Sequence, residues 1–413
     1  MSEWGKKYLP ELAKFINGYA FKPSDWQKEG LPIIRIEQLK DNNAKFDYFS
    51  GKVPEYNIIE NGDLIFSWSA SLFLQIWQRG KAILNQHLFK VENFNNTERL
   101  FLKYIIEYNL EELLKSAHGS TMQHITRKEL NKFKVYIPTS KQEQQKIAKI
   151  LSTIDRSIEQ TEKLIAKYRR IKTGMMQDLL TKGIDDKGNI RNEKTHKFKD
   201  SPLGRVPVEW EVVKLGELKP FITSGSRNWA QYYASEGALF IRIGNLTREH
   251  INMRFDDIQR VNATNTSEGN RTKLKKNDLL ISITADLGII AVIPENFEEA
   301  YINQHIALVR FNSENIYPRF IGNFLSSRIG SNQFLWLNDS GAKAGLSLKT
   351  VEKILIAIPT LTEQIKIENR FKAVEKSIAI ERNKLFKLQK LKTGLMQDLL
   401  SGKVRVGYEK RNK

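Results

Sequence analysis

The chain carries one sequence pattern twice, and this duplication constrains its fold more than any other feature. Residues 171–180 are IKTGMMQDLL and residues 391–400 are LKTGLMQDLL. At the same offset, residues 143–180 and 363–400 align without a gap and share fifteen of thirty-eight residues. A repeat of this length is typical of a chain that forms one structural unit twice.

The repeat continues upstream, with offsets that vary as they do when loops differ in length. The matched positions are Trp4 with Trp210, Leu9 with Leu215, Leu12 with Leu218, Phe15 with Phe221, 34–36 with 241–243, 63–67 with 278–282, 85–87 with 303–305 and 137–139 with 358–360. A chain of 413 residues has room for two or three domains. The repeat indicates the order globular unit, helix, globular unit, helix.

This order predicts five segments. Residues 1–140 form the first globular unit and residues 141–182 the first long helix. Residues 183–205 are polar and nearly free of large apolar side chains, which is typical of an exposed linker. The second globular unit covers 206–360, and the second long helix with a C-terminal tail covers 361–413.

The two predicted helices carry apolar residues at alternating spacings of four and three. In the first, these are Ile147, Leu151, Ile154, Ile158, Ile165, Tyr168, Met175 and Leu179; in the second, Ile367, Phe371, Val374, Ile378, Leu385, Leu388, Leu395 and Leu399. Polar residues interrupt this seam at Thr161, Lys172, Glu381 and Lys392. Such heptads predict coiled-coil helices. Because the first helix leads to the second unit, the second helix buries its seam best by running back antiparallel to the first.

Each globular unit mixes short β-type runs with helical stretches, which predicts an α+β fold for both. The expected strands are 32–36, 63–67, 134–137, 239–243, 278–283 and 354–358, and the expected helices are 99–115, 318–325 and a short one starting at 126.

The charge of the chain favours a polyanionic partner. Sixty-six Lys and Arg residues oppose 47 acidic ones, a formal net charge of +19, so nucleic acid ranks ahead of an anionic membrane surface. No apolar run is long enough to span a bilayer, and the N-terminus lacks the apolar segment of a secretion signal. The complete absence of cysteine suits a reducing cytoplasm and excludes disulfides and thiolate chemistry.

The motifs of common reaction centres are missing. Residues 183–188 have the glycine spacing of a phosphate loop, but Asn189 follows where lysine is needed. Neither H-E-x-x-H, G-x-G-x-x-G, G-x-S-x-G nor the [ND]-P-P-[YF] signature of amino-methyltransferases occurs. His118 and His124 are close in sequence but lack further metal ligands. We therefore expect no metal site, no cofactor and no catalytic residues in this chain.

Two features at matched positions have both a structural and a DNA-binding interpretation. Arg35 and Arg242 lie within predicted strands, where a guanidinium either contacts a phosphate or forms a framework ion pair. The triplet Asn-Gln-His recurs at 85–87 and 303–305, and its side chains can read base edges. A triplet retained in both units fits a shared structural role better than the reading of two different sequences.

Other loops differ between the units, as two readers of different sequences would require, although ordinary loop drift explains the differences equally well. The differing pairs are 67–71 with 282–286, 119–125 with 341–346, and 18–26 with 225–229. The candidate DNA contacts are Lys22, Arg35, Trp68, Ser69, Ser71, Ser120, Gln123, His124, Arg227, Asn228, Arg242, Thr284, Lys343 and Lys349.

Basic side chains also crowd the first long helix. They are Lys163, Lys167, Arg169, Arg170 and Lys172. A solvated helix face is the default interpretation of such a run, and a stripe that follows DNA phosphates is the alternative.

Three features together resemble one known family over essentially the whole chain. E-Q-x-K-I lies near the start of each long helix, K-T-G-[ML]-M-Q-D-L-L closes it, and the entire unit is duplicated. The segment FKDSPLGRVPVEW at 198–210 belongs to the same pattern. The chain resembles the specificity (S) subunit of type I restriction-modification systems.

The resemblance implies that the globular units are target recognition domains, each reading one half of a split, asymmetric double-stranded DNA sequence, and that the helices set their spacing. Two methyltransferase subunits would dock on the helices and methylate adenine, and restriction subunits would join them. S-adenosylmethionine, ATP and Mg would be bound by those partner subunits only. The candidate docking residues are Thr173, Gly174, Gln177, Asp178, Thr393, Gly394, Gln397 and Asp398.

Two other classes of function stay open on sequence grounds. One is a bivalent adaptor whose coiled coil joins two protein-binding units. The other is a nuclease or methyltransferase with degenerate motifs.

Overall fold

The structure, a computed structural model, describes residues 3–69, 71–116, 125, 127–225, 227, 229–262, 267–338 and 345–406. The chain divides into two compact units. Unit 1 comprises residues 1–163 and 381–413, and unit 2 comprises residues 164–380. Each long helix therefore begins in one unit and ends in the other.

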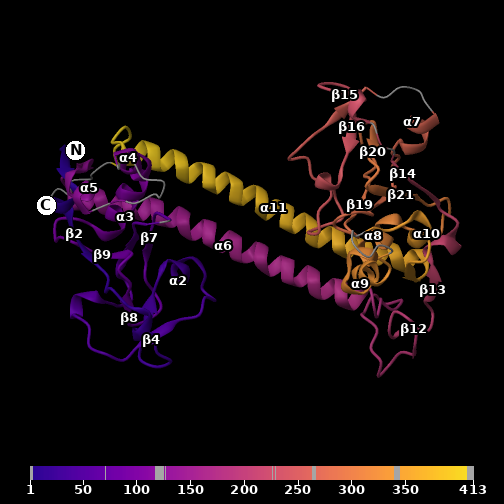
Figure 1. Cartoon of the computed structure of the whole chain (residues 1–413), viewed down its shortest axis with the longest axis horizontal. Coiled ribbons are helices and arrows are strands. Elements are labelled where there is room, and N and C mark those ends of the chain that lie inside the picture. Colours follow the sequence, from indigo (N-terminus) through magenta and orange to yellow (C-terminus); the bar gives the residue numbers. More distant parts are fainter. Residues whose placement is uncertain are drawn as a thin grey trace. The chain divides into compact units, whose positions relative to one another are not determined.

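Unit 1 contains the first globular domain (Figure 1). Its strands are β1 (Trp4–Tyr8), β2 (Ala13–Asn17), β3 (Leu31–Ile34), β4 (Asp47–Phe49), β5 (Ile58–Ile59), β6 (Leu64–Ser67), β7 (Phe73–Ile76), β8 (Ala82–Leu84), β9 (Leu88–Asn93) and β10 (Lys134–Pro138). Its helices are α1 (Leu9–Leu12), α2 (Ile36–Lys40), α3 (Arg99–Tyr108), α4 (Leu110–Ser116), α5 (Arg127–Lys132) and the start of α6 (Lys141–Leu179).

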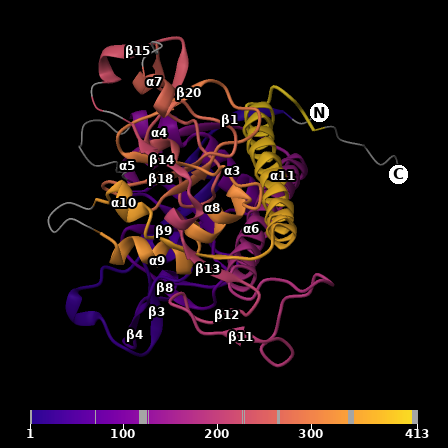
Figure 2. The same ribbon diagram turned by 90° about the vertical axis from the view of Figure 1, so that its right-hand side faces the viewer.

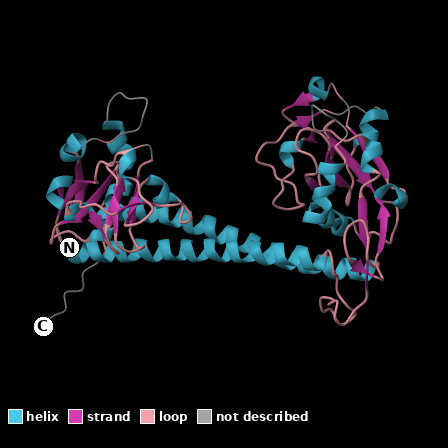
Figure 3. Ribbon diagram, turned by 60° about the horizontal axis from the view of Figure 1, so that its bottom comes forward, coloured by secondary structure: helices cyan, strands magenta, loops and turns pink. Residues whose placement is uncertain are grey.

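Unit 2 contains the second globular domain, which also combines strands with helices (Figure 3). Its strands are β11 (Phe198–Lys199), β12 (Val206–Pro207), β13 (Glu211–Lys214), β14 (Phe221–Ser224), β15 (Tyr233–Ala234), β16 (Ala238–Ile241), β17 (Arg260–Val261), β18 (Leu279–Ser282), β19 (Ile290–Val292), β20 (Ala300–Ile302), β21 (Ile306–Arg310) and β22 (Leu355–Ile358). Its helices are α7 (Ser267–Thr272), α8 (Pro318–Ser326), α9 (Arg328–Trp336), α10 (Leu348–Val351) and the start of α11 (Leu361–Leu400).

The main antiparallel sheets of the two units correspond strand by strand. The antiparallel sheet β2-β9-β6-β7 of unit 1 matches β14-β21-β18-β19 of unit 2. Both units also have a second four-stranded sheet with one parallel pair, β3 with β8 and β16 with β20. The two-stranded sheets β1-β10 and β13-β22 precede the long helices. The predicted α+β class and its duplication are confirmed.

Both long helices contribute to the core of each unit. In unit 1, Ile147 and Leu151 of α6 share a buried cluster with Leu399 of α11. In unit 2, Leu179 of α6 joins the cluster that contains Ile367 of α11. These are positions of the predicted heptad seam, so the apolar stripe read from the sequence is the face that the helices bury.

The two helices run antiparallel within each unit. In unit 1, Glu143 of α6 pairs with Arg405, just beyond α11, and Asp155, further along α6, pairs with the earlier residue Lys392. In unit 2, Lys172 of α6 pairs with Glu375. The antiparallel order deduced from the connectivity is thus confirmed, whereas supercoiling of the pair stays a prediction.

Two local expectations differ from the structure. The helix expected over 99–115 is two helices separated at Asn109, whose side-chain amide donates to the carbonyl oxygen of Ile105 at 2.7 Å. An asparagine side chain competes in this way with the regular helical hydrogen bonds.

The segment expected to be an exposed linker, 183–205, is partly folded into unit 2. Ile184 and Arg191 are buried, and Ile184 forms a β-bridge with Ile190. Strand β11 at its end pairs with β12 (Figure 2). The polar composition of the segment does not predict this burial, because Arg191 is a charged residue that is buried together with its partner.

Candidate nucleic-acid interface

The turns after β6 and β18 are built in the same way in both units. Ser67 Oγ donates to the carbonyl oxygen of Ser71 at 2.6 Å, and Ser282 Oγ donates to that of Asp286 at 2.5 Å. Both serines are fully buried. The turn is therefore a common framework, on which the intervening residues differ.

A second divergent loop ends at each of these turns. The backbone N–H of Ile125 donates to the carbonyl oxygen of Trp68 at 3.1 Å, and that of Leu346 donates to Ile283 at 2.9 Å. Gly345 also forms a β-bridge with Thr284. The structure thus brings the ends of two candidate reading loops together in each unit.

In unit 1, the three candidate residues of the loop after β6 differ in their exposure and contacts. The Trp68 ring centroid is 6.0 Å from that of His87. Ser69 is only 4% exposed. Ser71 Oγ accepts a hydrogen bond from Lys40 Nζ at 2.5 Å.

In unit 2, Thr284 is part of a hydrogen-bonded chain. Gln304 Nε2 lies 2.9 Å from His305 Nε2, and Thr284 Oγ1 lies 2.7 Å from His305 Nδ1. With a neutral ring, the amide donates to Nε2, so Nδ1 carries the hydrogen and donates to Thr284 Oγ1. The hydroxyl hydrogen of Thr284 is then left to donate elsewhere, which is what a base acceptor requires.

The asparagine of the repeated Asn-Gln-His triplet has a structural role. Asn85 Oδ1 accepts from the backbone N–H of His87 at 3.3 Å, and Asn303 Oδ1 accepts from that of His305 at 3.1 Å. Both asparagines are buried. The structural interpretation preferred from the sequence therefore holds for the asparagine, while His305 also reaches Thr284.

The placement of Arg35 and Arg242 within strands is wrong. Each follows its strand directly and precedes a short helix, because β3 ends at Ile34 and β16 at Ile241. Arg35 Nη1 pairs with Asp47 at 2.6 Å, and Arg242 Nη2 pairs with Asp257 at 2.8 Å. The framework ion pair, one of the two interpretations, is present at both arginines, and a phosphate contact stays a prediction.

A hollow of about 290 Å³ lies beside this part of unit 2. Arg242, Asp257, Asn303 and His305 are among the residues that line it. It combines a cation, an imidazole and amide groups, which are the side-chain types that contact phosphates and base edges.

The remaining candidates divide into surface residues and residues outside the described part. Lys22, Arg227 and Lys349 are exposed. The candidates outside the described residues are Ser120, Gln123, His124, Asn228 and Lys343.

The basic residues of α6 are largely paired within the chain. Lys163 pairs with Glu159 at 2.6 Å, Arg169 lies 3.7 Å from Glu249, and Lys172 is buried against α11. Lys167 and Arg170 are exposed. This distribution favours a helix face with local ion pairs over a continuous phosphate-binding stripe.

The closing motif of each long helix presents matching exposed side chains. Thr173, Gln177, Thr393 and Gln397 are exposed in both copies. Each threonine hydroxyl donates to the carbonyl oxygen four residues earlier at 3.1 Å. Within the motif, the same threonine and glutamine side chains are therefore available to a partner on both helices.

The two glycines of this motif have no packing reason within the described chain. A Cβ added at Gly174 or Gly394 would have no atom within 4 Å. Glycine in the interior of a helix costs about 1 kcal/mol relative to alanine. A close approach by another molecule would account for a glycine at this position in both copies.

At the helix ends, the Asp178 side chain and the Asp398 backbone make contacts within the chain. Asp178 pairs with Lys182 at 2.8 Å. The carbonyl oxygen of Asp398 accepts from the N–H of Val404 at 2.9 Å. Their contacts lie within the chain.

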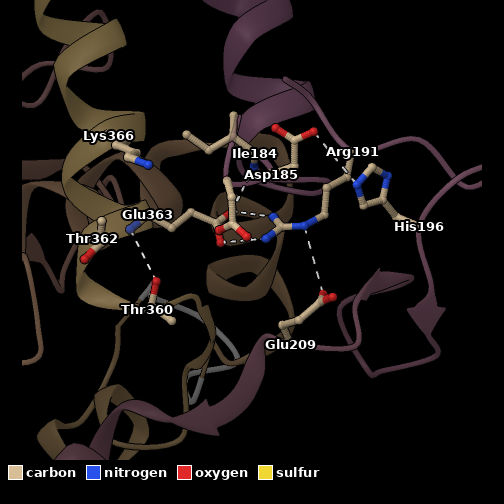
Figure 4. Close-up of a pocket in the computed structure, with 10 residues that line it drawn as sticks. Ile184, Asp185, Arg191, His196, Glu209, Thr360, Thr362, Glu363 and Lys366 are labelled. Atoms are coloured by element: carbon tan, nitrogen blue, oxygen red, sulfur yellow. Dashed lines mark hydrogen bonds and ion pairs between the residues drawn. The ribbon is translucent and has the colours of Figure 1, made fainter. Parts of the chain in front are cut away.

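Sequence reasoning missed a buried clamp at the start of α11. Glu363 forms a bidentate ion pair with Arg191, with Nη2 3.0 Å from Oε2 (Figure 4). Trp210 Nε1 donates to the same carboxylate at 3.4 Å. Burial opposes the charge of Arg191, but Glu363 outweighs it and raises the pKa of Arg191 above its usual value. A cavity of about 520 Å³ adjoins this group.

Unit 1 has the equivalent clamp at the start of α6. Glu143 accepts from Trp4 Nε1 at 3.3 Å and from Arg405 Nε at 2.8 Å. The sequence repeat aligns Trp4 with Trp210 and Glu143 with Glu363. Two of the three residues of each clamp can therefore be found from the sequence. The arginines follow the preceding helix at different distances, and no alignment signal paired them.

Neither a metal site nor a membrane-spanning helix is found among the described residues. No group of three or more His, Cys, Asp or Glu side chains there is placed to hold a metal ion. No helix among them combines the length and the apolar composition needed to cross a membrane.

Known proteins resemble the chain over nearly its full length. The family model for the type I restriction modification DNA specificity domain matches residues 1–168 and 207–390. The MjaVIII specificity subunit of Methanocaldococcus jannaschii is 27% identical, covering 98% of this chain and 93% of its own. The EcoBI specificity subunit of Escherichia coli is 22% identical, covering 99% and 88%.

A solved structure has the same fold. The S subunit of a type I restriction-modification system from M. genitalium superposes with a TM-score of 0.61 over 97% of this chain and 96% of its own, at 16% identity. At that identity the likeness concerns the fold alone.

Proposed function

Because this chain belongs to the specificity subunits of type I restriction-modification systems and has two recognition domains, we propose that it selects the DNA sequence on which such a complex acts. Each globular domain would read one half of a bipartite, asymmetric target in double-stranded DNA. The length of the helices would set the number of unread base pairs between the halves.

One observation carries this proposal. The two domains share a framework down to single hydrogen bonds, such as Ser67 to Ser71 and Ser282 to Asp286. The residues between the two hydrogen-bonded positions of each turn differ. One domain has a tryptophan and small residues there, and the other has a threonine that is hydrogen-bonded to His305. Two copies of one scaffold with different loop side chains are suited to two different half-sites. The net charge of +19 adds attraction to DNA that is independent of sequence.

The long helices would hold two methyltransferase subunits. Thr173, Gly174 and Gln177, with the equivalent residues of α11, form the docking surface in this proposal. The apolar residue three positions before each glycine supports it, because Ile171 is 39% and Leu391 49% exposed. Asp398 would belong to the same surface, whereas Asp178 would instead hold the end of α6 through Lys182.

The reaction itself would take place on the partners. This chain would act in the cytoplasm without a cofactor of its own. Methyltransferase subunits would supply S-adenosylmethionine for adenine methylation, and restriction subunits would supply ATP and Mg chemistry.

Reconstitution tests this proposal against the two alternatives. The purified chain, the methyltransferase subunit and their mixture are each incubated with DNA and S-adenosylmethionine, and methylated adenines are mapped by sequencing. We expect methylation at one bipartite sequence in the mixture alone. Methylation by the chain alone would identify an enzyme, and a complex with no sequence-dependent methylation would identify an adaptor.

A further inference from the structure

A stripe of exposed residues runs along each long helix into the closing motif. Residues spaced by four, three and four lie on one face of a helix. The stripe consists of Ala166, Arg170, Thr173 and Gln177 on α6, and of Phe386, Lys390, Thr393 and Gln397 on α11. All eight are exposed.

The two stripes differ mainly at their first position. The Phe386 side chain is 57% exposed, and Lys390 Nζ lies 4.5 Å from its ring centroid. The equivalent Ala166 offers a methyl group. The second position keeps its positive charge, with Arg170 in one copy and Lys390 in the other, and the last two positions are identical.

A partner that covers the threonine and glutamine also covers the first position. Gln397 lies eleven positions after Phe386, which is about 16 Å along a helix. A stable protein interface buries about 800 Å² on each partner and is wider than that distance. Two identical partner subunits would therefore meet a phenyl ring on α11 and a methyl group on α6.

From this difference we infer that the two methyltransferase subunits dock with unequal affinity, and that the subunit on α11 binds first. The inference rests on the proposed function, since it takes the partner from that proposal. Aromatic side chains that become buried in an interface are frequent anchors of binding. The partner surface would be an apolar pocket with acidic groups at its rim, facing the ring and the adjacent cation.

A stepwise titration of the full chain with the methyltransferase subunit, followed by native mass spectrometry, tests the inference. Two identical sites have stepwise constants that differ only by the statistical ratio. For the wild-type chain we expect a further gap of about tenfold, the effect of burying a phenyl ring instead of a methyl group. Phe386→Ala should remove this gap, and Ala166→Phe should tighten the weaker step by a similar factor.

The order of filling can be observed separately because the chain has no cysteine. A single cysteine at Lys163 or at Asn383, equivalent exposed positions on α6 and α11, carries a fluorophore on one helix only. The label at 383 should respond at the lower concentration of methyltransferase subunit.

Several results would overturn the inference. The first two are stepwise constants of the wild-type chain that differ only by the statistical ratio, and a gap that persists in Phe386→Ala. The others are an Ala166→Phe variant without tighter binding of the second subunit, and a label at 163 that responds before the label at 383. Failure of the proposed function looks different, because the wild-type chain would then bind no methyltransferase subunit at all.

Discussion

Lys172 of α6 forms an ion pair with Glu375 of α11, with Nζ 2.7 Å from Oε1. The equivalent pair in unit 1 joins Lys392 of α11 to Asp155 of α6, also at 2.7 Å. Each lysine interrupts the apolar seam of its helix. Polar groups at seam positions are best known for fixing the register of paired helices, and these reciprocal pairs have the geometry for that role.

Reversing the charge of Lys172 should destabilise unit 2. Lys172→Glu places two carboxylates together in a largely buried site, and we expect the free energy of unfolding to fall by about 2 kcal/mol. Urea denaturation measures the change. The control is Lys167→Glu, an exposed position on the same helix, which should have little effect. Adding Glu375→Gln to Lys172→Glu should recover part of the lost stability. If Lys172→Glu and Lys167→Glu lowered the free energy of unfolding equally, a role for the ion pair would be excluded.

Removal of Arg191 should loosen the start of α11. Arg191→Ala leaves the buried Glu363 carboxylate without its counter-charge, which we expect to cost about 3 kcal/mol locally. Hydrogen exchange of the first turns of α11 reports this change as lost protection.

Arg405→Ala is the matched variant in unit 1. The Arg405 side chain is 24% exposed, compared with 9% for Arg191, so its removal should cost less and should affect the start of α6 instead. Loss of protection at the same helix start in both variants would contradict the assignment of the two clamps.

Much of the fold could be predicted because the chain is duplicated. The heptad seam located the buried faces of both long helices, and matched strands located the sheets. The clamps could not be predicted in full, because Arg191 and Arg405 come from segments of unequal length. A charged residue in a polar stretch predicts an exposed side chain unless its buried partner is known. For this reason the sequence predicts exposure of the segment 183–205.

The candidate site was less predictable than the fold. Thr284 could be chosen only because it lies in a loop that differs between the units. Its contact with His305 joins residues 21 positions apart and depends on tertiary structure. Both strands end two residues earlier than expected, at Ile34 and Ile241, and the guanidinium groups of Arg35 and Arg242 lie beside Asp47 and Asp257.

Burial of Glu368 should make stability depend on pH. Burial raises the pKa of Glu368 above its ordinary value, although the adjacent Arg319 opposes the rise. A carboxyl group with a raised pKa binds more protons folded than unfolded, so its contribution to stability declines as pH rises from about 4.5 towards the folded pKa. Glu368→Gln should remove this part of the decline in the free energy of unfolding, which urea denaturation at several pH values measures. The same pH profile in the variant and the wild-type chain would contradict a role of Glu368.

Loss of the Thr284 hydroxyl should affect one half-site. Thr284→Val removes the hydrogen-bond donor while nearly keeping the volume, and we expect discrimination at one base pair of the half-site read by unit 2 to fall by about tenfold. Methylation assays on single-base variants of the target measure this. Thr362→Val, at an exposed position of α11, is the control. If the half-site read by unit 1 changed instead, the assignment would be wrong.

Domain exchange tests most directly whether the two domains read separate half-sites. Residues 1–140 are replaced by the corresponding residues of a related specificity subunit, and adenine methylation by the reconstituted complex is mapped across a genome. We predict that one half of the bipartite target changes to that of the relative, while the other half and the spacer stay the same. A change in both halves, or in neither, would contradict the account.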